Sequence, residues 1–305
     1  MYTFKKILVG LDQSEMDLQL IDAACKICQI SRSSDIYFIN VIKDFEVPES
    51  VLQEFPDILD KALEERKGEI KKLVDDKFQC EAVNVHYIIK QGQATKEFMK
   101  LINEEKMDLI VLGRKNEMKG GGILINRLAR RATCSMMAIP KNSNISVSNM
   151  LVPIDFSSYA KMAFEKAVEF ANKEPGSKIV AQNVYQVPNG YRYTGKTFDE
   201  FSEIMRENAK NSYKVFTKDI KSNDLNVDTI YTLDKDDDVI SQIYQNAKDQ
   251  NATMILMGAK GRSATTAIFI GSKAEKMIQL DSDIPIIIIR PKGKGAGILE
   301  YIKEI

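Results

Sequence analysis

The sequence predicts an α/β protein made of two tandem domains, each with a doubly wound, five-stranded parallel sheet. Three observations support this fold class. The chain has 305 residues, which is enough for about two domains. Its second half repeats the motifs of its first half in the same order, and apolar strand-like runs alternate with helix-like segments throughout. Such alternation produces right-handed crossovers and a Rossmann-like sheet.

The repeat begins with a strand that is followed by an aspartate. KKILVGLDQSE (5–15) returns as SNMLVPIDFSS (148–158), so Asp12 corresponds to Asp155, 143 residues later. Two later pairs keep the order: DLIVLGRK (108–115) with TMILMGAK (253–260), and CSMMAIPK (134–141) with IPIIIIRPK (284–292). The polar segment NSNISVSN (142–149) separates the halves as a linker would. We therefore predict domains at 1–143 and 147–292 and a C-terminal tail at 293–305, whose role the sequence does not indicate.

Each half has five predicted strands and four predicted helices. In the first half the strands are at about 6–11, 36–42, 83–89, 108–112 and 135–139, and the helices at about 14–30, 49–78, 95–105 and 126–133. In the second half the strands are at about 149–154, 178–184, 227–233, 253–257 and 285–290, and the helices at about 157–172, 197–221, 237–249 and 271–280. Runs such as Ile36–Ile39 and Ile286–Ile289 are apolar throughout, as strands buried on both faces are. Ligands of such sheets bind beyond the carboxyl ends of the strands, where the strand order reverses.

The composition excludes several classes of function. Lys and Arg number 43 and Asp and Glu number 43, so the net charge of +0 argues against nucleic acid or an anionic membrane as a partner. No apolar run approaches the roughly 18 residues of a membrane-spanning helix, and Met1–Gly10 leads directly into a strand, so we expect no signal peptide. Four irregularly spaced Cys make no disulfide framework, which predicts a cytoplasmic protein. A single His excludes a multi-histidine metal site within the chain, and we expect no metal site.

The second half carries a candidate phosphate-binding loop after its fourth strand. The segment MGAKGRSATTAIFIGSKAEKMI (257–278) has the spacing G-x2-G-x9-G-S, which its Gly258, Gly261, Gly271 and Ser272 provide. Glycines let backbone N–H groups approach an anion closely, and Gly271-Ser272 opens a helix whose N-terminus favours negative charge. Lys260 and Arg262 add positive charge beside the loop. The alternative is an ordinary Gly-rich turn followed by a Ser N-cap.

This pattern resembles the universal stress protein family, and the resemblance covers both halves of the chain. The segments LVPIDFS, MILMGAKGRS and GSKAEKMI all fit that family. In its ATP-binding branch the glycines and the hydroxyl hold the phosphates and ribose, a carboxylate after the first strand lies near the adenosine, and a position after the second strand contacts adenine. The resemblance therefore implies ATP as the ligand, with Mg²⁺ left open, and implies these binding residues: Asp155, Val184, Gly258, Gly261, Arg262, Gly271 and Ser272.

The first half departs from the motif. Asp12 and Gly113 remain, but Asn116 stands at the position of Gly261, and Asn126-Arg127 stand where the spacing requires Gly-Ser. The Gly120–Gly122 run lies at a different spacing, and the final helix is expected to be about one turn shorter. We interpret this site as degenerate and the first half as a structural or regulatory partner. A site rebuilt for another ligand is the alternative.

Other candidates have simpler explanations. Cys25 and Cys28 form a C-x-x-C motif, which in other proteins is a redox or metal-binding pair. We prefer the alternative that both are core residues of the first helix. His86 lies alone in the third strand, which favours a structural role. Asp12, with Ser14, is expected to cap its helix. The Tyr- and Gly-rich segment 189–201 is either a cover over a nucleotide base or a surface loop.

The resemblance favours a cytoplasmic, ATP-binding stress-response protein that acts as a nucleotide-dependent regulator rather than a fast enzyme. We assign no catalytic residue, because no carboxylate, Gln or His can be placed opposite a γ-phosphate. The alternatives are a slow ATP hydrolase or phosphoryl-transfer protein and a nucleotide-free interaction scaffold. The resemblance also implies an intramolecular pseudo-dimer, since single-domain members often dimerise through the last strand. Here 135–139 would pair with 285–290, and a further homodimer through other faces stays open.

Overall fold

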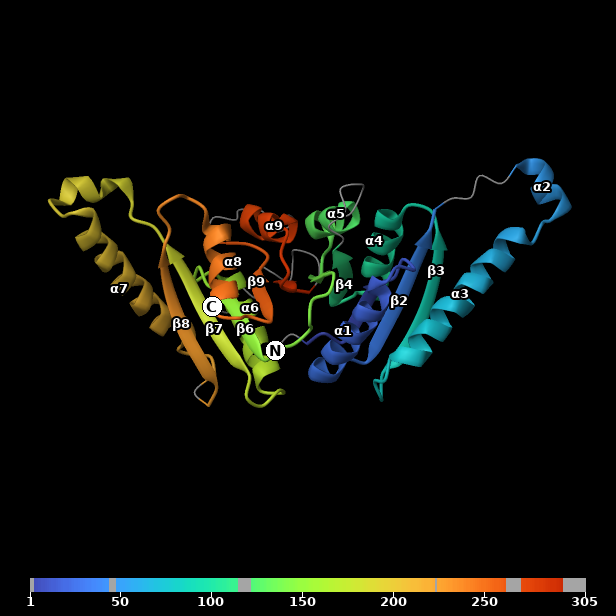
Figure 1. The fold of residues 1–305 in the computed structure, drawn as a ribbon, viewed down its shortest axis with the longest axis horizontal. Helices are drawn as coiled ribbons and strands as arrows, with labels where there is room; N and C mark the ends of the chain where they lie inside the picture. The colour runs from blue at the N-terminus through green and yellow to red at the C-terminus, as the bar shows by residue number, and fades with distance from the viewer. Residues whose placement is uncertain (1–2, 44–47, 115–121, 223, 262–269, 293–305) are drawn as a thin grey trace. The chain divides into compact units, whose positions relative to one another are not determined.

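The computed structural model describes residues 3–43, 48–114, 122–222, 224–261 and 270–292 (Figure 1). The chain divides into two compact units, Met1–Asn142 and Ser143–Ile305. In the described ranges, no helix is both long and apolar enough to cross a membrane.

The first unit alternates strands and helices. In chain order its elements are β1 (Lys6–Gly10), α1 (Met16–Ser31), β2 (Asp35–Ile42), α2 (Glu49–Glu54), α3 (Ile58–Lys77), β3 (Asn84–Gln91), α4 (Ala94–Glu105), β4 (Leu109–Arg114), α5 (Ile123–Arg131) and β5 (Ser135–Pro140). The strand order is β3-β2-β1-β4-β5, and the strand pairs within the unit are parallel. Helix α1 packs with α3, and α4 packs with α5.

The second unit repeats this plan. Its elements are β6 (Asn149–Pro153), α6 (Ser158–Ala171), β7 (Lys178–Tyr185), a 3-10 helix (Asn189–Thr194), α7 (Phe198–Thr217), β8 (Asn226–Leu233), α8 (Val239–Asp249), β9 (Met254–Gly258), α9 (Ser272–Gln279) and β10 (Ile286–Ile289). The strand order is β8-β7-β6-β9-β10, again with parallel pairs. The predicted fold class, two tandem doubly wound parallel sheets, is confirmed.

The strand order reverses at the first strand of each unit. Strand β1 pairs with β2 on one side and β4 on the other, and β6 likewise lies between β7 and β9. The chain therefore moves outward in both directions from β1 and from β6. In sheets of this kind the ligand-binding crevice lies beyond the carboxyl ends of the strands at which the order reverses. The apolar strands form the cores, as expected: Leu8, Val9 and Ile286–Ile289 are almost fully buried.

The predicted helix 49–78 is wrong in one respect, because the structure breaks it into α2 and α3. Phe55, the C-cap residue directly after α2, has φ −129° and ψ 72°, which is not helical. Pro56 follows, and a residue before proline is sterically pushed out of the helical region. The break therefore follows directly from the proline.

The expectation of a shorter final helix in the first unit is also wrong. Helix α5 has 9 residues and α9 has 8. Helix α5 begins at Ile123 with Gly122 at its N-cap, as α9 begins at Ser272 with Gly271 at its N-cap. Asn126-Arg127 lie inside α5, so they do not occupy the place of Gly271-Ser272. The first unit is therefore shorter than the second in the loop before this helix and not in the helix itself. Loops tolerate changes of length best.

Candidate functional site

The crevice of the second unit brings together the two loops that the sequence singled out. Asp155 follows β6 and Gly261 follows β9. A Cβ atom added at Gly261 would lie 2.7 Å from Oδ2 of Asp155, so the carboxylate lies directly against the glycine backbone. Gly261 itself is exposed. Residues 106 positions apart in the chain thus form one surface at the reversal of strand order.

The loop that carries Asp155 has a fixed geometry. Oδ1 of Asp155 accepts a hydrogen bond from the backbone N–H of Ser157 at 3.0 Å. Ser157 is the N-cap of α6, and its Oγ accepts from the N–H of Ala160 at 3.2 Å. Between them Phe156 has φ 64°, a left-handed conformation that turns the chain sharply into the helix. The aspartate is thereby held by the start of α6, with its second oxygen directed at Gly261.

The three glycines of the motif meet different neighbours. At Gly258 a Cβ atom would lie 2.6 Å from the backbone carbon of Tyr159 and 2.7 Å from its oxygen, so this glycine lets α6 pack on β9. At Gly271 a Cβ would lie 3.2 Å from the carbonyl oxygen of Ala259, and the N–H of Gly271 donates to that oxygen at 2.8 Å. Gly271 therefore fastens the start of α9 to the turn after β9, while Gly258 has a packing role.

Ser272 is the first residue of α9, and its side chain is exposed. The N-cap of this helix is Gly271, which has no side chain to cap it. The alternative reading of Ser272 as an ordinary N-cap is therefore wrong. The helix presents backbone N–H groups at its first turn, as an anion site does. Arg262, also in the predicted set, lies outside the described residues.

Val184 lies near the carboxyl end of β7, half-buried and opposite Thr232 of β8. Its neighbour Asn183 donates from Nδ2 to the carbonyl oxygen of Ile154 at 2.6 Å and so ties β7 to the Asp155 loop. The first unit has the same tie, from Asn40 to Leu11 at 2.8 Å. Val184 thus lies on the strand next to the one that leads into the Asp155 loop.

Two positive side chains that the predicted set omits lie near this crevice. Lys260 follows β9 and Arg290 follows β10, and both are buried, with 8% of each exposed. The Nζ atom of Lys260 lies 6.0 Å from the ring centre of Tyr159 on α6. Burial lowers the pKa of Lys260, and the charge of Arg290 lowers it further. The only sequence signal for Arg290 was that it is the first charged residue after the Ile286–Ile289 run.

The equivalent loop of the first unit is arranged differently. The expectation that Asp12 and Ser14 cap α1 is wrong: the N-cap residue is Glu15, and no side-chain cap bond forms. Instead Asp17, which is 1% exposed, accepts hydrogen bonds from the backbone N–H groups of Asp12 at 3.1 Å and Gln13 at 2.8 Å. Asn116, Gly120 and Gly121 lie outside the described residues.

Neither cysteine of the C-x-x-C motif forms a disulfide in the structure. Cys28 is 1% exposed in the core, as predicted, and burial raises its pKa to about 12. Cys25 is only half-buried, so its assignment to the core was too strong. In the described ranges no group of three or more His, Cys, Asp or Glu side chains is arranged to hold a metal ion.

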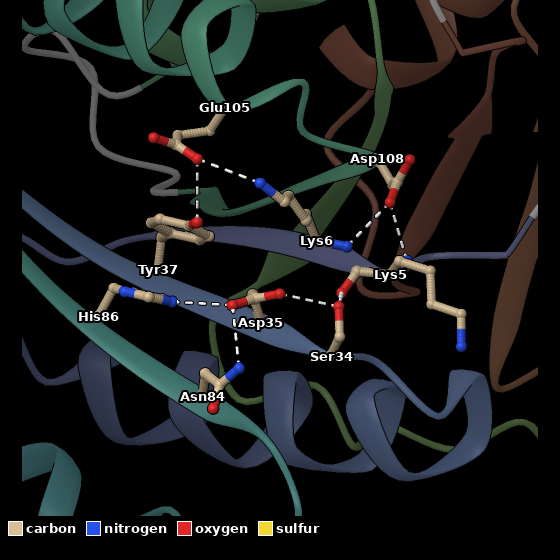
Figure 2. A network of polar contacts seen from close by, with 9 residues as sticks. All are labelled: Lys5, Lys6, Ser34, Asp35, Tyr37, Asn84, His86, Glu105 and Asp108. Atoms are coloured by element: carbon tan, nitrogen blue, oxygen red, sulfur yellow. Dashed lines mark hydrogen bonds and ion pairs between the residues drawn. The ribbon is translucent and has the colours of Figure 1, made fainter.

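His86 belongs to a polar network at the amino ends of the strands, away from the crevice (Figure 2). Its ring stacks on Tyr37 with a centroid distance of 4.2 Å, and its Nε2 lies 2.9 Å from Oδ1 of Asp35. That hydrogen bond lowers the pKa of Asp35. These contacts tie β3 to β2 and agree with a structural role for His86.

The chain matches known proteins along nearly all of its length. The model of the universal stress protein family matches residues 3–140 and again residues 147–290. A universal stress protein of Methanocaldococcus jannaschii is 22% identical over 163 residues, which cover 49% of this chain and 98% of that protein.

Two solved structures share the fold across both units. The crystal structure of a universal stress protein from Archaeoglobus fulgidus has a TM-score of 0.64 at 17% identity and covers 95% of this chain and 97% of its own. That of a protein from Pseudomonas aeruginosa described as a putative universal stress protein has a TM-score of 0.65 at 13% identity and covers 99% and 97%.

Proposed function

Because the chain belongs to the universal stress protein family, we propose that its second unit binds one molecule of ATP and that the protein is a cytoplasmic, nucleotide-dependent regulator of a stress response. The observation that supports this most is the contact of the Asp155 carboxylate with the exposed backbone of Gly261, at the reversal of strand order. A carboxylate and open backbone N–H groups are complementary to ribose hydroxyls and phosphates respectively.

Each part of the crevice has a role in this proposal. Asp155, held by the N–H of Ser157, accepts a hydrogen bond from a ribose hydroxyl with its second oxygen. The exposed Gly261 and the uncapped start of α9 at Ser272 offer N–H groups to the phosphates. Val184, on β7, lies beside the adenine. Lys260 and Arg290 supply a positive field, which the buried setting screens less than water would.

We assign no catalytic residue, so the protein is proposed as a regulator rather than a fast enzyme. Slow hydrolysis or phosphoryl transfer is the alternative activity. Single-turnover measurements on bound ATP separate the two, because a regulator releases ATP unchanged. A nucleotide-free scaffold is the remaining alternative, and extraction of nucleotide from the purified protein tests it.

The binding proposal is tested by calorimetric titration of ATP into wild type, Asp155→Ala and the matched control Asp12→Ala. We expect one site per chain. Because a lost hydrogen bond to a charged group costs about 1.5–3 kcal/mol, Asp155→Ala is expected to weaken affinity at least about tenfold. Asp12→Ala, at the corresponding place in the first unit, is expected to leave it unchanged. Titrations with and without Mg²⁺ show whether the ion accompanies the nucleotide.

Two results would contradict the proposal. Unchanged affinity in folded Asp155→Ala would remove Asp155 from the site, and two equivalent sites per chain would show that the first unit also binds ATP. Asp155 is a sharper target than Gly271, because a Cβ atom at Gly271 would already crowd the carbonyl of Ala259 at 3.2 Å. A variant there would mix a change in folding with a change in binding.

A further inference from the structure

The first unit contains a cavity outside the crevice described above. It has a volume of about 430 Å³, within the range of small-molecule sites. Its lining residues come from the start of α4 and from α5, namely Gln93, Thr95, Lys96, Met99, Arg127 and Arg131. Five of these six side chains are polar or charged, and none is acidic.

Three positively charged side chains line this cavity, and its described lining includes no carboxylate. Within the described ranges, the ion pairs of the structure involve other residues than Lys96, Arg127 and Arg131. Arg127 and Arg131 are four residues apart on α5 and so project from the same face, where like charges repel. The negative end of the α5 dipole accounts for Arg131 in the last turn, but not for Arg127 in the middle of the helix.

The start of α4 adds to the positive character of the cavity. The N-cap of α4 is Gln93, whose side chain makes no cap hydrogen bond. The N–H of Lys96 donates to the Gln93 carbonyl at 2.9 Å, which leaves the N–H groups of Ala94 and Thr95 without a backbone partner among the described residues. These two groups can bind an anion, and the dipole of this 12-residue helix has its positive end there. The Thr95 hydroxyl, which also lines the cavity, is a further donor.

In the second unit, the start of α8 and helix α9 correspond to the start of α4 and helix α5, and they carry less positive charge. The N-cap of α8 is Asp238, whose carboxylate accepts from the N–H of Ser241 at 3.2 Å and so caps its own helix. On α9, Lys276 is five residues after the N-cap, as Arg127 is on α5, but Leu280 stands where α5 has Arg131. An acidic cap and one cation in the second unit are thus replaced by a neutral cap and three cations in the first.

We propose that the cavity between α4 and α5 of the first unit binds a small, multiply charged phosphorylated anion. The planar guanidinium groups of Arg127 and Arg131 match phosphate oxygens in bidentate fashion, and Lys96 adds a compact charge. The positive charge of three cations and a helix N-terminus is larger than the single negative charge of a carboxylate. A phosphorylated anion carries more negative charge and is therefore the better match. This site is separate from the ATP crevice and does not depend on it.

The test is calorimetric titration of pyrophosphate into the full chain at low salt. Wild type, Arg127→Gln and Arg131→Gln are compared with the control Lys276→Gln, which removes a charge from the corresponding place in the second unit. We expect each Arg variant to weaken binding at least about fivefold and Lys276→Gln to leave it unchanged. The three side chains are exposed, so the variants are expected to fold, and thermal melts check this.

Three outcomes would overturn the proposal. Equal affinity in wild type and both Arg variants would place pyrophosphate elsewhere, including in the second unit. An equal loss of pyrophosphate affinity in Lys276→Gln would indicate that binding depends only on the overall charge of the protein. Malonate binding as tightly as pyrophosphate would exclude a phosphate-selective site, whereas we expect malonate to bind at least about tenfold more weakly.

Discussion

Gly258 and Gly261 are three residues apart, yet a side chain would meet different obstacles at the two positions. At Gly258 the obstacle is the backbone of α6, which cannot move without separating the helix from the sheet. At Gly261 it is the carboxylate oxygen of Asp155, which can move only if the hydrogen bond from the N–H of Ser157 adjusts. The first glycine of the motif therefore has a packing role, whereas the second belongs to the binding surface proposed above.

Gly258→Ala is therefore expected to destabilise the protein. A Cβ atom 2.6 Å from the backbone carbon of Tyr159 forces α6 away from β9, and overpacking of this kind costs about 1–3 kcal/mol. For a unit of this size the melting temperature should fall by roughly 2–4 °C per kcal/mol, measured by circular dichroism. The control is Gly190→Ala in the same unit, where a Cβ would meet nothing within 4 Å. Equal melting temperatures for the two variants would show that the helix and strand adjust without cost.

The sequence predicted the site residues that belong to short motifs and missed those that depend on contacts between distant segments. Asp155 and the glycines follow strands and have a recognisable spacing. Arg290 reaches the same region only because β10 lies beside β9. Asp17 accepts hydrogen bonds from the backbone N–H groups of Asp12 and Gln13, which precede it in the chain. The sequence instead favours Asp12 as the cap of this helix, because Asp12 comes shortly before it.

Among the elements, α4 is attached to the sheet by a hydrogen-bonded network (Figure 2). Glu105, at its last position, lies 3.1 Å from Nζ of Lys6 on β1 and accepts from the Tyr37 hydroxyl on β2 at 3.1 Å. Just after the helix, Oδ2 of Asp108 accepts from the N–H groups of Lys5 and Lys6, both at 2.8 Å. One helix end is thus connected to two strands through side chains that titrate.

The network predicts a stability that depends on pH. The hydrogen bond from Lys6 lowers the pKa of Glu105, and the Tyr37 hydroxyl lowers it further. A carboxyl group whose pKa is lower in the folded state stabilises the fold above its unfolded pKa of about 4.3, and this contribution is lost as pH falls through the folded pKa. The hydrogen bond with Glu105 also raises the pKa of Lys6, so the contribution of that amine is lost only as pH rises through a value above 10.5. The pair is therefore at full strength from about pH 5 to pH 10.

Glu105→Gln is accordingly expected to be less stable than wild type at pH 7, and the difference is expected to shrink as pH falls from 5 toward 3. The difference should be at most about 1 kcal/mol, because the Glu105 side chain is 39% exposed and solvent screens the pair. Thermal melts at pH 7 and pH 3 measure it. Glu104→Gln, one residue earlier and exposed, makes the same change of charge outside the network and serves as the control. A difference that is as large at pH 3 as at pH 7 would show that the effect is not electrostatic.

At the scale of elements, most of the fold was accessible from the sequence because apolar runs and their alternation repeat in both halves. The strands were located to within two residues of the observed bounds. Two errors have a local cause. Pro56 was present but was not used to divide the helix at 49–78, and α5 was placed by counting residues from Gly113 across a loop whose length differs between the units.

For the whole molecule, the doubled plan indicates a division of roles between the units. The second unit has Asp155 against an exposed Gly261, whereas the corresponding loop of the first unit is bound by its own buried Asp17. The first unit instead carries the cationic cavity between α4 and α5. The two proposals together therefore assign a different ligand to each unit of one repeated fold.

The last prediction concerns how the two units assemble. Within the second unit β10 is the final strand in the order, and its four residues are all isoleucine. An apolar edge strand invites pairing with another strand, and we propose that β5 of the first unit supplies it as a pseudo-dimer. The eight residues of the segment 142–149 can span at most roughly 26–29 Å, enough for the two strand ends to meet.

A fragment of residues 144–305 is therefore expected to dimerise or aggregate, because its isoleucine strand lacks β5, the partner proposed for it. Sedimentation at increasing concentration measures this, with the full chain as the control. A fragment that stays monomeric and soluble at high concentration would show that β10 needs no partner strand from the first unit. The pseudo-dimer proposal would then be wrong. If the full chain also dimerises, the isoleucine strand is not the surface responsible, and other faces of the units must form that contact.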